Sequence, residues 1–226
     1  VQENIRIKAR GRPKRIDRDA VIRSAFNLYW EHGVEHVPLT RVAEEADVNR
    51  VSIYHEFGGE ENLLLESLRF YKQAFQSRIK NIDENADLPA VVHVMFKTVI
   101  FDGALDWSKP EVALFKNDNS SIKREPNHLG CFYLQTKLVR NLLRDSHSLY
   151  FDRFDSALVK RLTRCIDAAR EKGTVFSHLD SKKTSEFLVL QLGLFQTLRQ
   201  SNCSEQKMLD AFTFIESMVI PKKYRV

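Results

Sequence analysis

Residues 50–55 gather side chains that bind nucleic acids onto one short segment. Arg50, Val51, Ser52, Tyr54 and His55 fall within six positions, and none of the five is acidic. Arginine, hydroxyl and imidazole groups bond DNA phosphates and base edges, and apolar groups pack on thymine methyls. On a short helix with a solvent-facing side, such a set is too poor in acids for an ordinary hydrated surface. It indicates a nucleic-acid contact.

The start of the chain is strongly basic. Six basic residues precede Ile16, against the single acid Glu3; they are Arg6, Lys8, Arg10, Arg12, Lys14 and Arg15. Such a run is most often a solvated tail. It can instead be an arm that lies along an anionic polymer and releases counterions from its phosphates. The run alone leaves both interpretations open.

Two other groupings could carry catalysis or bind a metal, and both are weak. His128 and Cys131 form an HxxC pair without an orienting partner for a thiol nucleophile. His32 and His36 have the i, i+4 spacing of metal ligands, but a third ligand is missing and Gly33 interrupts a helix between them. There is no Walker loop and no GxGxxG motif. We therefore expect no enzymatic activity, metal or cofactor.

Composition favours a soluble globular protein with one or two domains. The 226 residues are 43% hydrophobic and 29% charged, with a net charge of +5. No apolar stretch approaches the roughly 20 residues that span a bilayer, and the first residues lack the apolar region of a signal peptide. Three widely spaced cysteines make no disulfide framework. These features predict a cytoplasmic protein without a membrane partner.

The elements that position these side chains are helices, because apolar residues recur at i, i+3 and i+4 almost throughout. Asp17 is the expected N-cap of the first helix and Gly33 its end; Pro38 begins the second. The fold class is all-α with about nine helices. The expected ranges are 17–32, 38–46, 50–57, 60–82, 88–105, 131–145, 149–172, 182–199 and 205–219, with a long loop at 107–129. We divide the chain into a basic arm (1–16), a first domain (17–75) and a second domain (83–226).

Only three residues separate the second helix from the third. Asp47 tolerates the left-handed backbone that such a turn needs, and Asn49 is a natural N-cap. The small side chains of the second helix can then pack on Ile53 and Phe57. Two short helices joined by a tight turn form the helix-turn-helix, about 38–57, whose second helix enters the major groove.

The first part of the chain resembles the N-terminal domain of the TetR/AcrR family. The segment that carries the resemblance is GRPKRIDRDAVIRSAFNLYWEHGVEHVPLTRVAEEADVNRVSIYHEFGGEENLLLESL. The shared features are the GRP arm, the LTxVAxxAxV segment and the YxxFG signature before a Glu- and Leu-rich helix. The match covers about residues 10–75 and is specific as a combination. The remaining chain resembles the family only in length, helicity and a Gly-Cys-Phe helix start at 130–132.

The resemblance implies a role for each matching residue. Thr40, Tyr54 and His55 would contact the phosphate backbone. Arg50, Val51 and Ser52 would meet base edges, with Arg50 on guanine and Val51 on a thymine methyl. Asn49 would act as cap and contact, and Arg12, with Arg10, would enter the minor groove.

Three residues depart from the family pattern. Asp47 replaces a usual glycine and Asn49 a common serine. Glu60 stands where many members carry a lysine that touches phosphate, so no DNA contact is expected there.

For the second domain the resemblance implies an effector cavity and a dimer interface. The expected cavity lining is aromatic, for a small hydrophobic or aromatic effector: Phe96, Trp107, Phe115, Phe132, Tyr133 and Phe195. The last two helices are too apolar for one face of a monomer, which predicts a four-helix homodimer interface. Its expected residues are Leu188, Gln191, Leu192, Phe195, Met208, Phe212, Ile215 and Val219. Core packing is the alternative for both sets.

The function that these features predict is a sequence-specific transcriptional regulator in a bacterial cytoplasm. It would be a ligand-responsive repressor that binds a palindromic double-stranded DNA operator as a homodimer. The effector would shift the population of dimers between two spacings of the recognition helices. Alternatives are a transcriptional activator, which would use the same contacts, and a helical protein that binds nucleic acid non-specifically through the basic arm.

Overall fold

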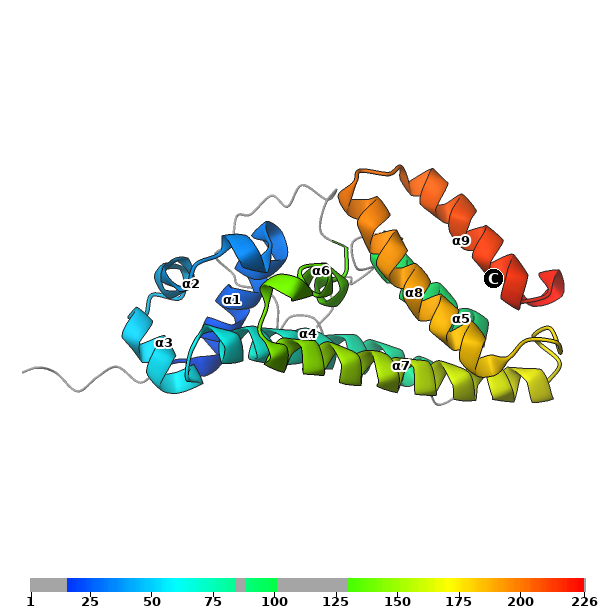
Figure 1. Ribbon diagram of the computed structural model, residues 1–226, viewed down its shortest axis with the longest axis horizontal. Coiled ribbons are helices and arrows are strands. Elements are labelled where there is room, and N and C mark those ends of the chain that lie inside the picture. The colour runs from blue at the N-terminus through cyan, green and yellow to red at the C-terminus, as the bar shows by residue number, and fades with distance from the viewer. Residues whose placement is uncertain (1–15, 84–87, 101–129, 226) are drawn as a thin grey trace, which may run out of the picture.

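The computed structural model describes residues 16–83, 88–100 and 130–225, and every regular element in these ranges is helical (Figure 1). Nine α-helices are present there, which confirms the predicted fold class. They are α1 (Arg18–His32), α2 (Leu39–Glu45), α3 (Arg50–Phe57), α4 (Glu60–Asp83), α5 (Leu88–Ile100), α6 (Phe132–Leu138), α7 (Asp145–Glu171), α8 (Ser181–Gln200) and α9 (Glu205–Val219). Short 3₁₀ turns η1 (Val34–His36), η3 (Arg140–Leu142) and η4 (Lys222–Tyr224) join or follow them. No helix in the described ranges has the length and hydropathy to cross a membrane.

Helices α1 to α3 and the start of α4 form the first domain, at one end of the elongated molecule (Figure 1). Its core consists of side chains with essentially no exposed surface, among them Phe26, Val42, Ile53 and Leu63. Helix α1 begins at Asp17, whose side chain accepts a hydrogen bond from the Ala20 amide at 3.0 Å, as predicted.

The second domain is built around α8. Helices α5 and α7 pack against it, and α9 packs on α5 and α8 at the far end of the molecule (Figure 1). Phe96 of α5 lies edge-on to Phe195 of α8, with ring centroids 5.0 Å apart, and 5.1 Å from the ring of Phe212 of α9. These aromatic contacts join three helices into one core.

An aromatic cluster joins the two domains. Phe26 and Trp30 of α1 pack on Tyr71 of α4 and Phe132 of α6, with Phe26 and Phe132 edge to face at 5.1 Å. The Trp30 indole donates a hydrogen bond to the main-chain oxygen of Gly130 at 3.1 Å. Gly130 has φ +58°, and a Cβ there would collide with the side-chain amide of Gln196. The positive φ favours glycine at this position, where the main chain meets Trp30 of the first domain on one side and Gln196 of α8 on the other.

The helix boundaries of residues 131–172 differ from the prediction. Helix α6 ends at Leu138, and α7 begins at Asp145, four residues before the expected start. Leu143 is extended and stops the helical path, and no side chain caps α7 at Arg144. Ser148, directly before the expected start at 149, therefore lies inside α7. The long loop predicted at 107–129 lies outside the described residues, as does the expected end of the 88–105 helix.

Candidate nucleic-acid interface

The turn between α2 and α3 has the local structure that its sequence predicts. Asp47 is left-handed, with φ +50°, and the Val48 amide donates to the Ala43 carbonyl at 2.9 Å. The Asn49 side chain then caps α3 by accepting a hydrogen bond from the Val51 amide at 2.8 Å. These local bonds fix α3 against α2, and Pro38 is the N-cap of α2 rather than its first residue.

Helix α3 is held by two inner side chains and presents the rest outward. Ile53 and Phe57 are buried, as predicted. On the opposite side Val51 is 58% exposed and Tyr54 43%, although both are large apolar groups whose exposure to water is unfavourable. Arg50 and His55 are also exposed, and Ser52 is half-buried; all five predicted side chains are thus at the surface to some degree.

Arg50 and Tyr54 interact along this outer face. The guanidinium donates a hydrogen bond to the Tyr54 hydroxyl at 3.3 Å, and its carbon lies 5.5 Å from the centre of the Tyr54 ring. The pair is one helical turn apart, so the contact costs no change in backbone. It holds the guanidinium beside the Tyr54 ring on the outer face.

Thr40 of α2 lies in the same surface as the start of α3. Thr40, Asn49 and Arg50 line one shallow surface hollow, and all three are exposed. The structure thus brings together residues from both helices of the helix-turn-helix. Arg10 and Arg12 lie outside the described residues.

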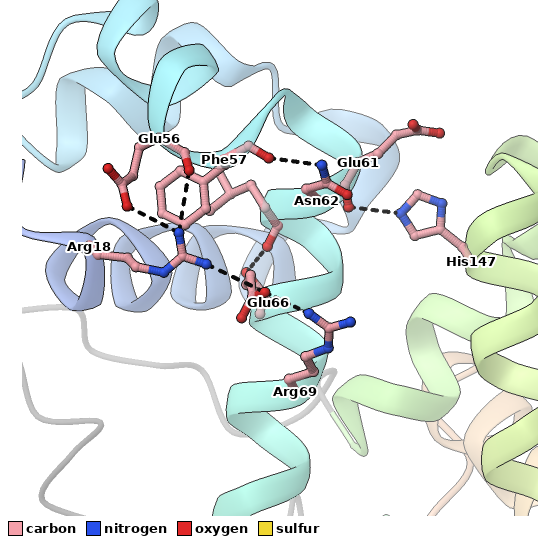
Figure 2. Close-up of polar contacts among 10 residues, drawn as sticks. Arg18, Glu56, Phe57, Glu61, Asn62, Glu66, Arg69 and His147 are labelled. Carbon is pink, nitrogen blue, oxygen red and sulfur yellow. Dashed lines mark hydrogen bonds and ion pairs between the residues drawn. The ribbon is translucent and has the colours of Figure 1, made fainter.

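Arg18 contacts both α3 and α4, which the sequence did not predict (Figure 2). Its guanidinium lies 4.5 Å from the centre of the Phe57 ring, 3.2 Å from the Glu56 carboxylate and 3.4 Å from that of Glu66. Asn62 completes the arrangement by donating to the Phe57 carbonyl at 2.8 Å. The contacts fasten the C-terminal end of α3 to the helices on either side.

Residues of α4 and of the second domain surround a small apolar cavity of about 60 Å³, and one predicted effector residue, Tyr133, lines it. Burial, reinforced by the nearby Asp155 carboxylate, raises the pKa of Tyr133. Burial also raises the pKa of the Cys131 thiol at the cavity wall. The described lining is Leu68, Tyr71, Lys72, Met95, Val99, Cys131, Tyr133, Leu134, Phe154, Asp155, Leu158, Val189 and Leu192.

Three of the other aromatic residues predicted for that cavity lie elsewhere. Phe96 and Phe195 pack on one another in the core, and Phe132 is buried in the cluster that joins the domains. Trp107 and Phe115 lie outside the described residues. The alternative considered from the sequence, core packing, therefore describes three of the six.

The residues predicted for the dimer interface face inward. Seven are buried within the chain itself: Leu188, Leu192, Phe195, Met208, Phe212, Ile215 and Val219. Gln191 is half-buried. They cannot present a surface to a partner, because α5, α8 and α9 already cover one another there.

The opposite faces of the same two helices are apolar and exposed. Leu190 and Leu194 on α8 and Phe214 and Met218 on α9 are between 47% and 71% exposed. Each pair is spaced by one helical turn, so each forms a stripe. The helices do carry more apolar surface than a monomer covers, as the sequence indicated, but on the other side.

The histidine pair considered as a metal site does not converge. The His32 ring accepts a hydrogen bond from Arg41 at 2.7 Å, and His36 lies beyond Gly33, 3.8 Å from Glu35. The described residues contain no group of three metal-binding side chains. His128, the proposed partner of Cys131, is outside the described residues.

The exposed helix-turn-helix places this all-helical, two-domain chain among the helix-turn-helix proteins. Comparison with known proteins narrows this class. Residues 21–67 match the family described as "Bacterial regulatory proteins, tetR family". The first domain is therefore a TetR-family domain.

One curated relative shares the N-terminal part. The HTH-type transcriptional repressor ComR of Escherichia coli (strain K12) is 37% identical over 71 residues, which is 31% of this chain and 34% of ComR. The matched part therefore spans about a third of that protein, and the likeness concerns the first domain.

Two solved structures share the fold over almost the whole chain. The TetR family regulator CifR, as a cysteine mutant complexed with a 26-bp double-strand operator DNA, has a TM-score of 0.66 at 17% identity, covering 92% of this chain and 100% of CifR. A regulator from Saccharomonospora viridis in complex with choline has a TM-score of 0.64 at 18% identity, covering 91% and 98%. The chain thus shares their fold at low sequence identity.

Proposed function

We propose that this protein is a transcriptional regulator that binds a double-stranded DNA operator through the outer face of α3. The single observation that carries the proposal is that Val51 and Tyr54 are exposed beside Arg50 and His55 on a helix anchored by Ile53 and Phe57. A short helix held from behind, with cationic, apolar and hydroxyl groups in front, has the shape and chemistry to enter a major groove.

The contacts divide into two classes. Tyr54, His55 and Thr40 are exposed and bind phosphates, which position the helix. Arg50, Val51 and Ser52 at the start of α3 read base edges, and Asn49 contributes beside its capping role. Arg10 and Arg12 reach the neighbouring minor groove. The operator complex of CifR, which shares the fold, supports duplex DNA as the ligand.

The protein acts as a homodimer on a palindromic site. The exposed apolar stripes of Leu190, Leu194, Phe214 and Met218 give α8 and α9 a second packing face, and two copies related by a two-fold axis would bury it as four helices. The same axis sets two α3 helices about one turn of DNA apart, roughly 34–36 Å. This face replaces the inward one predicted from the sequence.

Regulation is by a small effector bound in the second domain, with repression as its outcome. ComR is a repressor, and the S. viridis structure holds choline; both support this assignment for a chain of the same family. The apolar cavity beside Tyr133 is the candidate site for a hydrophobic or aromatic compound. An effector that prefers dimers of altered spacing lowers operator affinity by its own difference in affinity.

Selection of bound sequences from a random pool of duplex DNA tests the proposal. The expected product is a two-fold palindrome whose half-sites lie about one or more helical turns apart. Recovery of a single asymmetric motif would contradict the dimer, and recovery of no motif would leave only the non-specific alternative. Competition by random duplex should be weaker by about 10³ or more.

A further inference from the structure

A second cavity, of about 270 Å³, lies where the two domains meet, and we call it the junction cavity. One wall belongs to the first domain and consists of α1, η1 and the first turns of α4. The other wall is η3, the segment after it and the start of α7. The lining residues are Tyr29, Val34, Glu35, Glu60, Glu61, Leu64, Leu142, Leu143, Arg144 and His147. The cavity is separate from the apolar one beside Tyr133.

Three buried polar atoms of this lining lack a hydrogen-bond partner, and one of them, Oε1 of Glu61, is ion-paired with Arg144. Tyr29 is 1% exposed and His147 2%, yet neither the Tyr29 hydroxyl nor the Nδ1 atom of His147 is bonded. A buried polar group without a partner costs about 1–3 kcal/mol, so such groups are rare in native proteins. The Tyr29 hydroxyl and Nδ1 of His147 are therefore left for a polar group that enters the cavity.

The hydrogen bond of His147 shows what its free nitrogen can offer. Nε2 lies 3.1 Å from the main-chain oxygen of Glu61 (Figure 2). A carbonyl oxygen only accepts, so the hydrogen of the neutral ring is on Nε2. Nδ1 then carries a lone pair and is an acceptor.

The cavity is also acidic. Glu35, Glu60 and Glu61 stand against one cation, Arg144, which pairs with Glu61 at 3.0 Å. Burial and then the Glu60 carboxylate raise the pKa of Tyr29, which places that carboxylate within electrostatic reach of the hydroxyl. Within the described ranges Glu60 has no ion-pair partner.

We propose that the junction cavity binds a small protonated amine. Its ammonium group donates hydrogen bonds to the Tyr29 hydroxyl, to Nδ1 of His147 and to the Glu60 carboxylate. These three groups are acceptors with one formal negative charge, which suits an N–H-bearing cation. An anion is repelled by the carboxylates, a quaternary ammonium has no N–H to donate, and the described residues offer no trio of metal ligands.

An amine bound there touches both domains. Tyr29 and Glu60 belong to the helices that carry α3, whereas His147 belongs to α7 of the second domain. The site is independent of the proposed operator surface, so binding of the amine can be measured without DNA.

Titration calorimetry of the full chain with 1,4-diaminobutane tests the proposal. We expect saturable binding that Glu60→Gln weakens at least tenfold and Tyr29→Phe about threefold, as expected for the loss of a charged and a neutral hydrogen bond. Tyr29→Phe removes no existing bond, and Glu60 is exposed, so both variants should fold; circular dichroism checks this.

Two variants provide matched controls. Tyr150→Phe removes another buried, unbonded hydroxyl away from the cavity, and Glu45→Gln removes an exposed carboxylate on α2. Neither should change diamine affinity, and tetramethylammonium and acetate should not bind. Absence of binding at about 10 mM diamine, roughly tenfold above a millimolar Kd, would overturn the proposal. Equal binding by tetramethylammonium, or affinity unchanged in both cavity variants, would overturn it as well.

Discussion

Helix α3 and the pair α8 and α9 each bury one apolar face and expose another, but the exposed faces differ in chemistry. On α3 the exposed apolar groups, Val51 and Tyr54, stand among Arg50 and His55. On α8 and α9 four large apolar side chains form stripes, and the exposed acids Glu186 and Asp210 come one helical turn before them.

The difference separates two kinds of partner. Apolar groups mixed with cations and hydroxyls suit a polyanion that also offers methyl groups and hydrogen-bonding edges. A purely apolar centre with a charged rim is typical of protein interfaces. The exposure of apolar side chains does not by itself identify the partner of either surface. The chemistry of the residues around them indicates which kind of partner each surface binds.

The largest effect should come from the inner face of α9. Phe212→Ala removes a buried ring that packs on Phe96 and on the ring of His93. Loss of a buried phenylalanine costs about 3–5 kcal/mol. Urea denaturation should show this fall in the free energy of unfolding, and a change below about 1 kcal/mol would contradict the assignment of this face to the core.

The outer face of the same helix should behave in the opposite way. Phe214 is two residues further on and 67% exposed, so Phe214→Asp should leave the fold intact and place a charge in the proposed interface. We expect the dimer dissociation constant to rise by tenfold or more, as for a central interface residue. Sedimentation velocity over a dilution series measures it; Thr213→Asp, exposed beside it, is the control.

A smaller loss is expected on α3. Tyr54→Ala removes a proposed phosphate contact and the ring that orients Arg50. Because phosphates carry no sequence information, affinity for specific and random duplexes should fall alike, by about tenfold, which corresponds to 1.4 kcal/mol. Fluorescence anisotropy with both duplexes measures the two ratios, and a loss confined to the specific duplex would make Tyr54 a base-reading residue.

The smallest effect is expected at Arg18. Its ion pairs with Glu56 and Glu66 are partly exposed and therefore contribute little, so Arg18→Gln should lower the free energy of unfolding by at most about 1 kcal/mol. Thermal unfolding measures this. A much larger loss would show that the fastening of α3 is part of the core.

Local features of this fold were predictable from sequence. Asp17 and Asn49 cap helices as expected, because a cap depends on a side chain and amides two or three residues away. The start of α7 was not predictable, because it has no side-chain cap and its buried His147 bonds to Glu61, which is distant in sequence.

The candidate sites divide in the same way. The outer face of α3 followed from two anchors and a tight turn. The sequences of α8 and α9 predict more apolar surface than one buried face needs. Which of the two faces is buried depends on tertiary packing, because α5 covers only one of them. Arg18 and the junction cavity likewise depend on residues brought together by the fold.

The central claim is that α3 reads DNA sequence with its outer face. The most direct test compares the affinity of the wild type and Arg50→Ala for a selected duplex and for random duplex. The account predicts a wild-type margin of about 10³ or more, which Arg50→Ala reduces by about tenfold mainly through the selected duplex. Equal affinity of the wild type for both duplexes, or a margin unchanged in Arg50→Ala, would contradict it.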